Sequence, residues 1–148
     1  MNTASPGETA DRLNRRRARA MPVLALFLII QQAAFLTSDD KLRPVDMVRN
    51  AGWLVLAAVI LAGLVTGGFW LRSREVRSLM DDEVTRANRA DALMRGFTVA
   101  VATGIVLYGI EAFVPGTLNT REAIHLIVTF SLATALLRFG MLERRAIA

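Results

Sequence analysis

Four long apolar runs, separated by segments rich in arginine, constrain this chain more than any other feature of its sequence. The runs cover residues 20–38, 51–71, 96–114 and 123–142. A helix of about 20 apolar residues spans the hydrocarbon core of a bilayer, which is roughly 30 Å thick. We therefore predict an all-α integral membrane protein with four transmembrane helices, packed in lipid as one antiparallel bundle that forms a single domain from residue 20 to 148.

The composition agrees with this class and excludes several kinds of chemistry. Hydrophobic residues make up 53% of the 148 positions and the mean hydropathy is +0.39, which is high for a soluble domain. There is no cysteine, which rules out disulfides, thiolate nucleophiles and cysteine-bound metals. The net charge of +5 would suggest nucleic-acid binding in a soluble protein. Because the arginines lie at the ends of the apolar runs, we attribute the excess to membrane topology and expect no direct contact with nucleic acid.

The distribution of basic residues predicts the orientation of the chain. Fourteen arginines lie in residues 12–19, 72–95 and 138–145, whereas the two other connections, 39–49 and 115–121, hold four basic residues. Loops rich in Lys and Arg stay on the cytoplasmic side of a membrane. We therefore expect both termini and the 72–95 connection to lie in the cytoplasm.

Two segments outside the apolar runs have opposite characters. Residues 1–19 are polar and contain Pro, Gly and five arginines, so we predict a disordered basic tail. A basic stretch before an apolar run also describes a signal peptide, but residues 20–38 exceed a typical signal core and we favour a retained first helix. Residues 72–95 contain no Gly or Pro, and Ser78 with Asp81 resembles a capping box. We predict that the third helix starts near Ser78 and extends into the cytoplasm.

Polar side chains within the apolar runs form the first candidate site. Glu111 lies one turn before Pro115, and His125, the only histidine, lies one turn into the fourth run, so a helical hairpin could bring them together. Such a pair could relay protons or bind a cation. Both residues lie at interface depth, and the alternative role is to hold the hairpin. Gln31 and Gln32 lie deeper, and we expect interhelical hydrogen bonds from them rather than substrate contacts.

Small and aromatic residues give further expectations about packing. GxxxG-like pairs in the second and third runs allow close backbone contact, either within the bundle or in a homodimer. Trp53 and Trp70 stand 17 positions apart, about 25 Å along a helix, which is the separation expected of two interfacial aromatic belts. The small residues are Gly63 and Gly67 in the second run and Ala100 and Gly104 in the third.

The charged part of the 72–95 connection forms the second candidate site. Three consecutive acids could suggest a divalent-metal site, but consecutive helical positions diverge, and no histidine or further acid stands at helical spacing. We therefore expect no metal there, and instead a surface that binds a cytoplasmic protein. No Ser/His/Asp set, phosphate loop or HExxH motif is present, so we expect neither catalysis nor a cofactor. The candidate partner-binding residues are Asp81, Asp82, Glu83, Arg86 and Arg89.

The segment DDEVTRANRADALMRGF, followed directly by an apolar run, resembles a pattern in small, mostly uncharacterised bacterial four-helix membrane proteins. The resemblance covers Leu79 to about Phe113. Some members are encoded beside helix-turn-helix regulators. The resemblance therefore implies a location in the bacterial inner membrane and a role in holding or sensing for a DNA-binding partner. It rests on Asp82, Glu83, Arg86, Arg89 and Ala90.

Three functions follow as expectations from these features. The first is a non-enzymatic membrane protein whose cytoplasmic helix binds a cytoplasmic partner, such as a transcriptional regulator. The second is a small transporter coupled to protons or cations through Glu111 and His125. The third is an accessory subunit that packs through Gly63 and Gly67 against a larger membrane complex.

Overall fold

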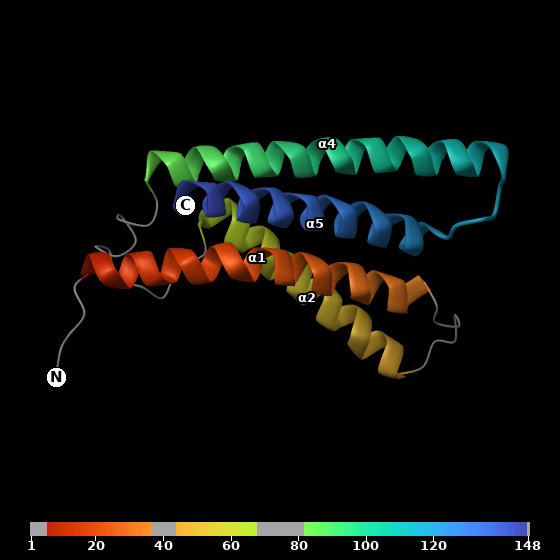
Figure 1. The fold of residues 1–148 in the computed structure, drawn as a ribbon. Coiled ribbons are helices and arrows are strands. Elements are labelled where there is room, and N and C mark those ends of the chain that lie inside the picture. Colours follow the sequence, from red (N-terminus) through yellow and green to blue (C-terminus); the bar gives the residue numbers. More distant parts are fainter. Residues whose placement is uncertain (1–5, 37–43, 68–81, 148) are drawn as a thin grey trace.

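The computed structural model describes residues 6–36, 44–67 and 82–147. In chain order, the helices of these segments are α1 (Pro6–Leu36), α2 (Pro44–Thr66), α4 (Glu83–Phe113) and α5 (Thr120–Ile147) (Figure 1). Each contains a stretch that is long and apolar enough to cross a membrane. The predicted all-α class with four candidate membrane helices is therefore confirmed for the described part of the chain.

Local sequence signals explain where α4 and α5 begin. The Asp82 carboxylate accepts a hydrogen bond from the Thr85 backbone N–H at 2.7 Å and so caps α4. At the start of α5, the side chains of Asn119 and Glu122 each accept a hydrogen bond from the other's backbone N–H, which is a capping box. Between the two helices, Gly116 has a φ of +79°, a left-handed conformation that suits glycine. The turn that joins α4 to α5 is thus specified locally.

The central helix of the fold is α5. It lies between α1 and α4, which run alongside it, and α2 crosses these helices obliquely (Figure 1). The starts of α1 and α4 and the end of α5 lie together at one end of the molecule (Figure 1). We call residues 7–19, 82–95 and 138–146 the charged end. Because α5 packs against both neighbours, it supplies much of the apolar core, including Leu132, Ala133, Ala135, Leu136 and Phe139.

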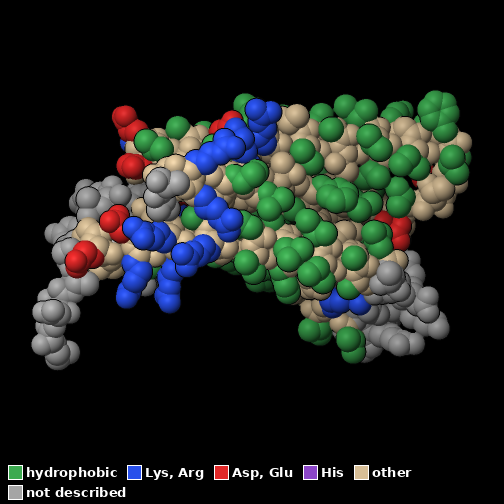
Figure 2. Space-filling view, in the orientation of Figure 1, with side chains coloured by type: hydrophobic (Ala, Val, Ile, Leu, Met, Phe, Trp, Pro, Cys, Tyr) green, Lys and Arg blue, Asp and Glu red, His purple; other side chains and the backbone are tan. Residues whose placement is uncertain are grey.

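Large apolar side chains are exposed along the helices away from the charged end. On α4, Ile105 and Tyr108 are 67% and 79% exposed. Figure 2 shows this apolar surface over one half of the molecule, whereas most Lys and Arg side chains gather over the other half. Soluble monomers rarely expose contiguous apolar surface on this scale. The residues by which α2 packs against the other helices are Trp53, Ala57, Ile60 and Leu64, at helical spacing.

Two glycines set close helix contacts on either side of α5. A Cβ atom added at Gly96 of α4 would lie 2.9 Å from the Ser131 backbone oxygen and 3.1 Å from the Cβ atom of Ala135. A Cβ atom added at Gly140 would lie 3.1 Å from the Cβ atom of Met21 in α1. A side chain does not fit at these distances without a shift, so glycine lets both neighbouring backbones approach α5.

Replacing Gly96 with alanine is expected to lower the free energy of unfolding by about 1–3 kcal/mol, because the new methyl group forces α4 away from α5. The matched control is Gly109→Ala on the same helix, where an added Cβ atom meets nothing within 4 Å. There alanine's better helix propensity is expected to stabilise the protein by up to about 1 kcal/mol. Unfolding in detergent measures both changes. A gain in stability from Gly96→Ala, like the gain expected from Gly109→Ala, would contradict the close contact of α4 with α5 at Gly96.

The first helix begins earlier than we predicted. We expected residues 1–19 to be disordered, but α1 begins at Pro6 and continues without a break into the apolar run. Alanine and arginine are good helix formers. Arg17 and Ala18 are also buried, and both bond to α5. Tertiary contacts therefore supply the stability that this polar segment lacks by itself.

The start of α4 and the surroundings of Trp53 also differ from what we predicted. The helix α4 begins at Glu83, because Asp82 has an extended backbone and caps the helix there, and not near Ser78. Ser78 and the acid three residues later lie outside the described residues. Trp53 is only 8% exposed and packs against the other helices, whereas we expected it at a membrane surface as part of an aromatic belt. Trp70 lies outside the described residues.

Candidate functional site

A buried ion pair joins α1 to α5 at the charged end. The guanidinium of Arg17 donates to the carboxylate of Glu143, and both side chains are more than nine-tenths buried. The Asn88 amide of α4 donates to the same carboxylate at 3.1 Å. Arg144 Nε donates to the Ala18 backbone oxygen at 3.2 Å. Glu143 therefore ties three helices together, and Arg17 compensates its charge within the fold.

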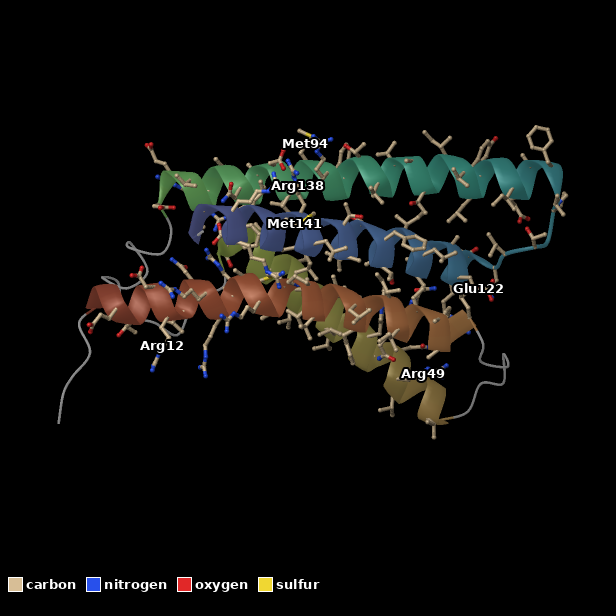
Figure 3. All side chains as sticks on the ribbon, in the orientation of Figure 1. Arg12, Arg49, Met94, Glu122, Arg138 and Met141 are labelled. Atoms are coloured by element: carbon tan, nitrogen blue, oxygen red, sulfur yellow. The ribbon has the colours of Figure 1, made fainter. Side chains whose placement is uncertain are left out.

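A second ion pair joins α4 to α5. Arg138 Nε donates to a carboxylate oxygen of Asp91 at 2.6 Å, and Arg95 Nε lies 4.0 Å from the other oxygen. Figure 3 shows Arg138 where the two helices meet. The side chains of Arg138 and Asp91 are 32% and 39% exposed, so solvent weakens this pair relative to the buried one.

A polar cavity of about 300 Å³ lies between α1, α4 and α5 at the charged end. The amide oxygen of Asn14, which lines it, is buried and accepts no hydrogen bond from the described residues. A buried acceptor of this kind favours a hydrogen-bond donor in the cavity. The other polar lining residues are Asp11, Arg15, Asp82, Thr85 and Glu143, so acids outnumber bases in the wall.

The structure separates the residues that we predicted to bind a partner. Asp82, Glu83 and Arg86 are exposed at the start of α4, and Asp82 also lines the polar cavity. Arg89 is half-buried and lines a different, apolar groove. Asp81 lies outside the described residues.

A buried aromatic cluster surrounds His125, toward the other end of the helices. The imidazole lies between the rings of Phe35 in α1 and Trp53 in α2, with ring centroids 4.0 Å and 3.6 Å away. Its Nδ1 atom lies 3.0 Å from the Gln32 side-chain oxygen, which also accepts a hydrogen bond from the Thr129 hydroxyl at 3.0 Å. We call these five residues the histidine cluster; they join α1, α2 and α5.

The hydrogen bonds of the histidine cluster orient the imidazole. The Gln32 side-chain oxygen is an acceptor, so the N–H of His125 that bonds to it is the one at Nδ1. The His125 Nε2 atom, the Trp53 indole nitrogen and the Gln32 amide nitrogen are buried without a hydrogen-bond partner among the described residues. The cluster therefore contains three buried nitrogen atoms whose hydrogen-bonding capacity is not used by the described residues.

Glu111 is not part of the histidine cluster. Its side chain is exposed, and its carboxylate accepts a hydrogen bond from the Gly116 backbone N–H at 2.8 Å. Among the described residues, the imidazole of His125 is held by Gln32 instead. The structure thus does not bring Glu111 and His125 together. Gln31 is half-buried and points about 100° away from Gln32 around the helix.

Among the described residues, Gly63 and Gly104 form no close contact with a neighbouring helix. A Cβ atom added at Gly63 would meet nothing within 4 Å. Gly67 follows the last residue of α2 with a φ of +84°. A Cβ atom at Gly104 would come no closer than 3.9 Å to another helix, an ordinary contact distance, and Ala100 is half-buried. The tight contacts among the described glycines are those of Gly96 in α4 and Gly140 in α5.

Sequence reasoning missed the residues that tie the helices together. Arg17 and Glu143 are 126 positions apart, and Arg17 is one of five arginines in its segment, so no local pattern marks it. Glu143 carried a usable signal, because it is the only acid after Glu122 and follows the fourth apolar run. Phe35 and Thr129 carried none, since aromatic and hydroxyl side chains are ordinary in apolar helices.

Comparisons with known proteins add no relative. Within the described residues there is no group of three His, Asp or Glu side chains that could hold a metal ion. No family model matches the chain, no curated protein matches it, and no solved structure matches it. The resemblance to bacterial four-helix membrane proteins stays a prediction.

Proposed function

We propose that this chain is a non-enzymatic, four-span protein of the bacterial inner membrane whose charged end binds a cytoplasmic protein partner. The observation that carries the proposal is the polar cavity, where the buried oxygen of Asn14 accepts no hydrogen bond from the described residues. The ion pairs of Arg17 and Arg138 hold α1 and α4 against α5. The cavity wall is thereby preorganised, which lowers the entropy cost of binding.

The distribution of charge supports an antiparallel bundle with its charged end in the cytoplasm. Arg17 near the start of α1 contacts Glu143 near the end of α5, whereas Gln32 near the end of α1 contacts His125 near the start of α5. The arginine-rich segments therefore gather at one end of the helices (Figure 2). The exposed apolar side chains beyond them then face lipid, and the positive-inside rule places the arginines in the cytoplasm.

Reporter fusions test this orientation. In a bacterial host, alkaline phosphatase fused after Ala148 is expected to be inactive, and a fluorescent protein fused there is expected to fold and fluoresce. Phosphatase inserted between Leu118 and Asn119 is expected to be active, because the connection between α4 and α5 would lie on the outer side of the membrane. The reverse pattern at both positions would contradict the proposed topology.

The chemistry of the cavity indicates what the partner presents. The acidic side chains of Asp11 and Asp82 and the acceptor oxygen of Asn14 line the same space, beside the Glu143 carboxylate that Arg17 already compensates. A Lys or Arg side chain of the partner would supply donors to them, and charged hydrogen bonds are the stronger kind. A helix-turn-helix regulator, the partner that the sequence resemblance implies, is the first candidate to test.

A photo-crosslinking residue at Val84, which is 55% exposed and lines the cavity, is expected to capture one cytoplasmic protein in living cells. Asn14→Leu removes the acceptor, and Asp82→Asn removes the charge while keeping a good helix cap. Each is expected to lower the crosslinking yield about 10-fold, the effect of losing one charged hydrogen bond.

Two controls make this experiment specific. Arg12 is exposed and does not line the cavity, so Arg12→Leu is expected to leave the yield unchanged. A crosslinker at Tyr108, far along α4, is expected not to capture the same protein. Equal capture at Val84 and Tyr108, or equal yields from all variants, would contradict docking at the cavity.

The two alternative functions differ in the support that the geometry gives them. A transporter built on Glu111 and His125 gains no support, because the Glu111 carboxylate accepts a hydrogen bond from the Gly116 backbone N–H. An accessory subunit keeps one observation in its favour, since the face of Gly63 is open. Crosslinking from Gly63 in native membranes separates this alternative from the proposal, because a large membrane partner would be captured there rather than at Val84.

A further inference from the structure

An apolar groove of about 220 Å³ lies between α1, α2 and α5 beside the charged end, and α4 contributes Arg89 to its wall. Its wall is almost entirely apolar, with two guanidiniums, those of Arg17 and Arg89, among the lining side chains. Along α1 the lining changes from Arg17 to Met21 to Leu24, about one turn at a time. The positive charge therefore lies toward the charged end, and the apolar part extends away from it.

The groove exists because α2 crosses the bundle obliquely and has little side-chain volume there. Gly63 and Gly67 both line the groove, and a Cβ atom added at Gly63 would meet nothing within 4 Å. The stripe of α2 that contacts the other helices passes beside this space through Ile60 and Leu64. The sequence singled out these two glycines as a helix-packing face, whereas in the fold they open a recess.

We propose that this groove binds one anionic phospholipid, with its phosphate at Arg17 and Arg89 and part of an acyl chain along Met21, Leu24 and Ile60. Guanidiniums bind phosphate through paired hydrogen bonds. A guanidinium carries five N–H donors, so Arg17 can hold Glu143 and a phosphate oxygen together. Basic pockets between membrane helices at the cytoplasmic surface are typical binding places for anionic headgroups.

The depth of the groove fits a lipid better than other occupants. Arg17 precedes the apolar run of α1, and Arg89 lies about 10 Å before Gly96, where the apolar part of α4 begins. Both charges therefore lie at headgroup level, with the apolar wall beside them. A free phosphate would leave that wall uncovered, whereas a phospholipid covers it with its acyl chain and brings its phosphate to the level of the guanidiniums.

This site is distinct from the polar cavity that we propose for the protein partner. It depends on the membrane location in that proposal but not on the partner. The experiment therefore uses the purified full chain in nanodiscs that contain equal amounts of phosphatidylglycerol and phosphatidylcholine. Native mass spectrometry counts the lipids that stay bound after release from the nanodisc. The wild type is expected to retain one phosphatidylglycerol, with a preference of about 10-fold or more over phosphatidylcholine.

Two matched pairs of variants locate the lipid. Gly63→Leu fills the groove, whereas Gly52→Leu adds the same side chain to α2 at a position that is equally open and does not line it. Arg89→Gln removes a lining charge, whereas Arg86→Gln removes an exposed charge one turn earlier on α4. The first variant of each pair is expected to lower phosphatidylglycerol retention about 10-fold, and the second to leave it unchanged.

Several results would overturn the proposal. Equal retention of the two lipids, or equal retention by Gly63→Leu and Gly52→Leu, would show that no lipid is held in the groove. Displacement of the lipid by inorganic phosphate would assign the site to the phosphate group alone. A dimer that Gly63→Leu abolishes would assign the groove to a second copy. Protein that stays monodisperse without detergent would instead contradict the membrane location, so the two failures are distinguishable.

Discussion

Replacing Glu143 with alanine is expected to lower the free energy of unfolding by about 3–5 kcal/mol. The carboxylate is buried and bonds to Arg17 of α1 and Asn88 of α4. Its removal leaves the buried guanidinium without this counter-charge, and breaking one side of a buried ion pair is more costly than never forming the pair. Reversible unfolding in mixed detergent micelles, followed by the loss of helical circular dichroism, measures the change.

Two further variants separate the ion pair from general damage to α5. Arg145 is exposed on the same helix, so Arg145→Ala is expected to change stability by less than about 0.5 kcal/mol. Arg17→Met combined with Glu143→Leu is expected to restore most of the lost stability, because apolar side chains replace a buried pair with little net cost. If Glu143→Ala cost as little as Arg145→Ala, the pair would not hold α1 against α5.

Replacing His125 with alanine is expected to lower the free energy of unfolding by a similar amount, about 3–5 kcal/mol. The change removes a ring that stacks on Phe35 and Trp53, and it leaves a cavity between three helices. It also removes the hydrogen bond that His125 donates to Gln32. The matched control is Glu111→Ala, where the side chain is exposed at the end of α4, and a cost of under about 1 kcal/mol is expected.

A double-mutant cycle separates the stacking of His125 from its hydrogen bond. His125→Phe keeps an aromatic ring but leaves the Gln32 oxygen with one donor fewer, so a cost of about 1–3 kcal/mol is expected. Adding Gln32→Leu removes that buried polar group. The double variant is then expected to lose less free energy of unfolding than the sum of the losses in the two single variants. Additive costs would show that Gln32 and His125 do not interact.

The elements of this fold could largely be predicted from the sequence, because the signals are local. Each apolar run is long enough to cross a bilayer, and the turn at Gly116 follows from Pro115 and Gly116 alone. The segment before residue 20 could not be predicted in the same way. Its helix depends on contacts of Arg17 and Ala18 with α5, which lie far away in the sequence.

The same distinction between local and long-range signals holds for the candidate sites. The exposed acids and arginines at the start of α4 were identified from their pattern, and Gln32 and His125 were identified as polar residues in apolar runs. The residues that contact Gln32 and His125 in the fold were not predicted. The pairing of Glu111 with His125 followed from the nearness of the two residues in a hairpin, but the rotation of α5 turns His125 toward α1 and α2.

The sequence alone determined that the chain is built from four long apolar helices with their arginines segregated, because hydrophobicity and charge belong to each segment by itself. Only the tertiary structure decided that Glu143 lies against Arg17, that His125 lies between two rings, and that Gly63 faces an open groove. These contacts depend on how far each helix is rotated and shifted against its neighbours. Apolar side chains pack in many such registers, and the close approach of backbones at Gly96 and Gly140 selects one.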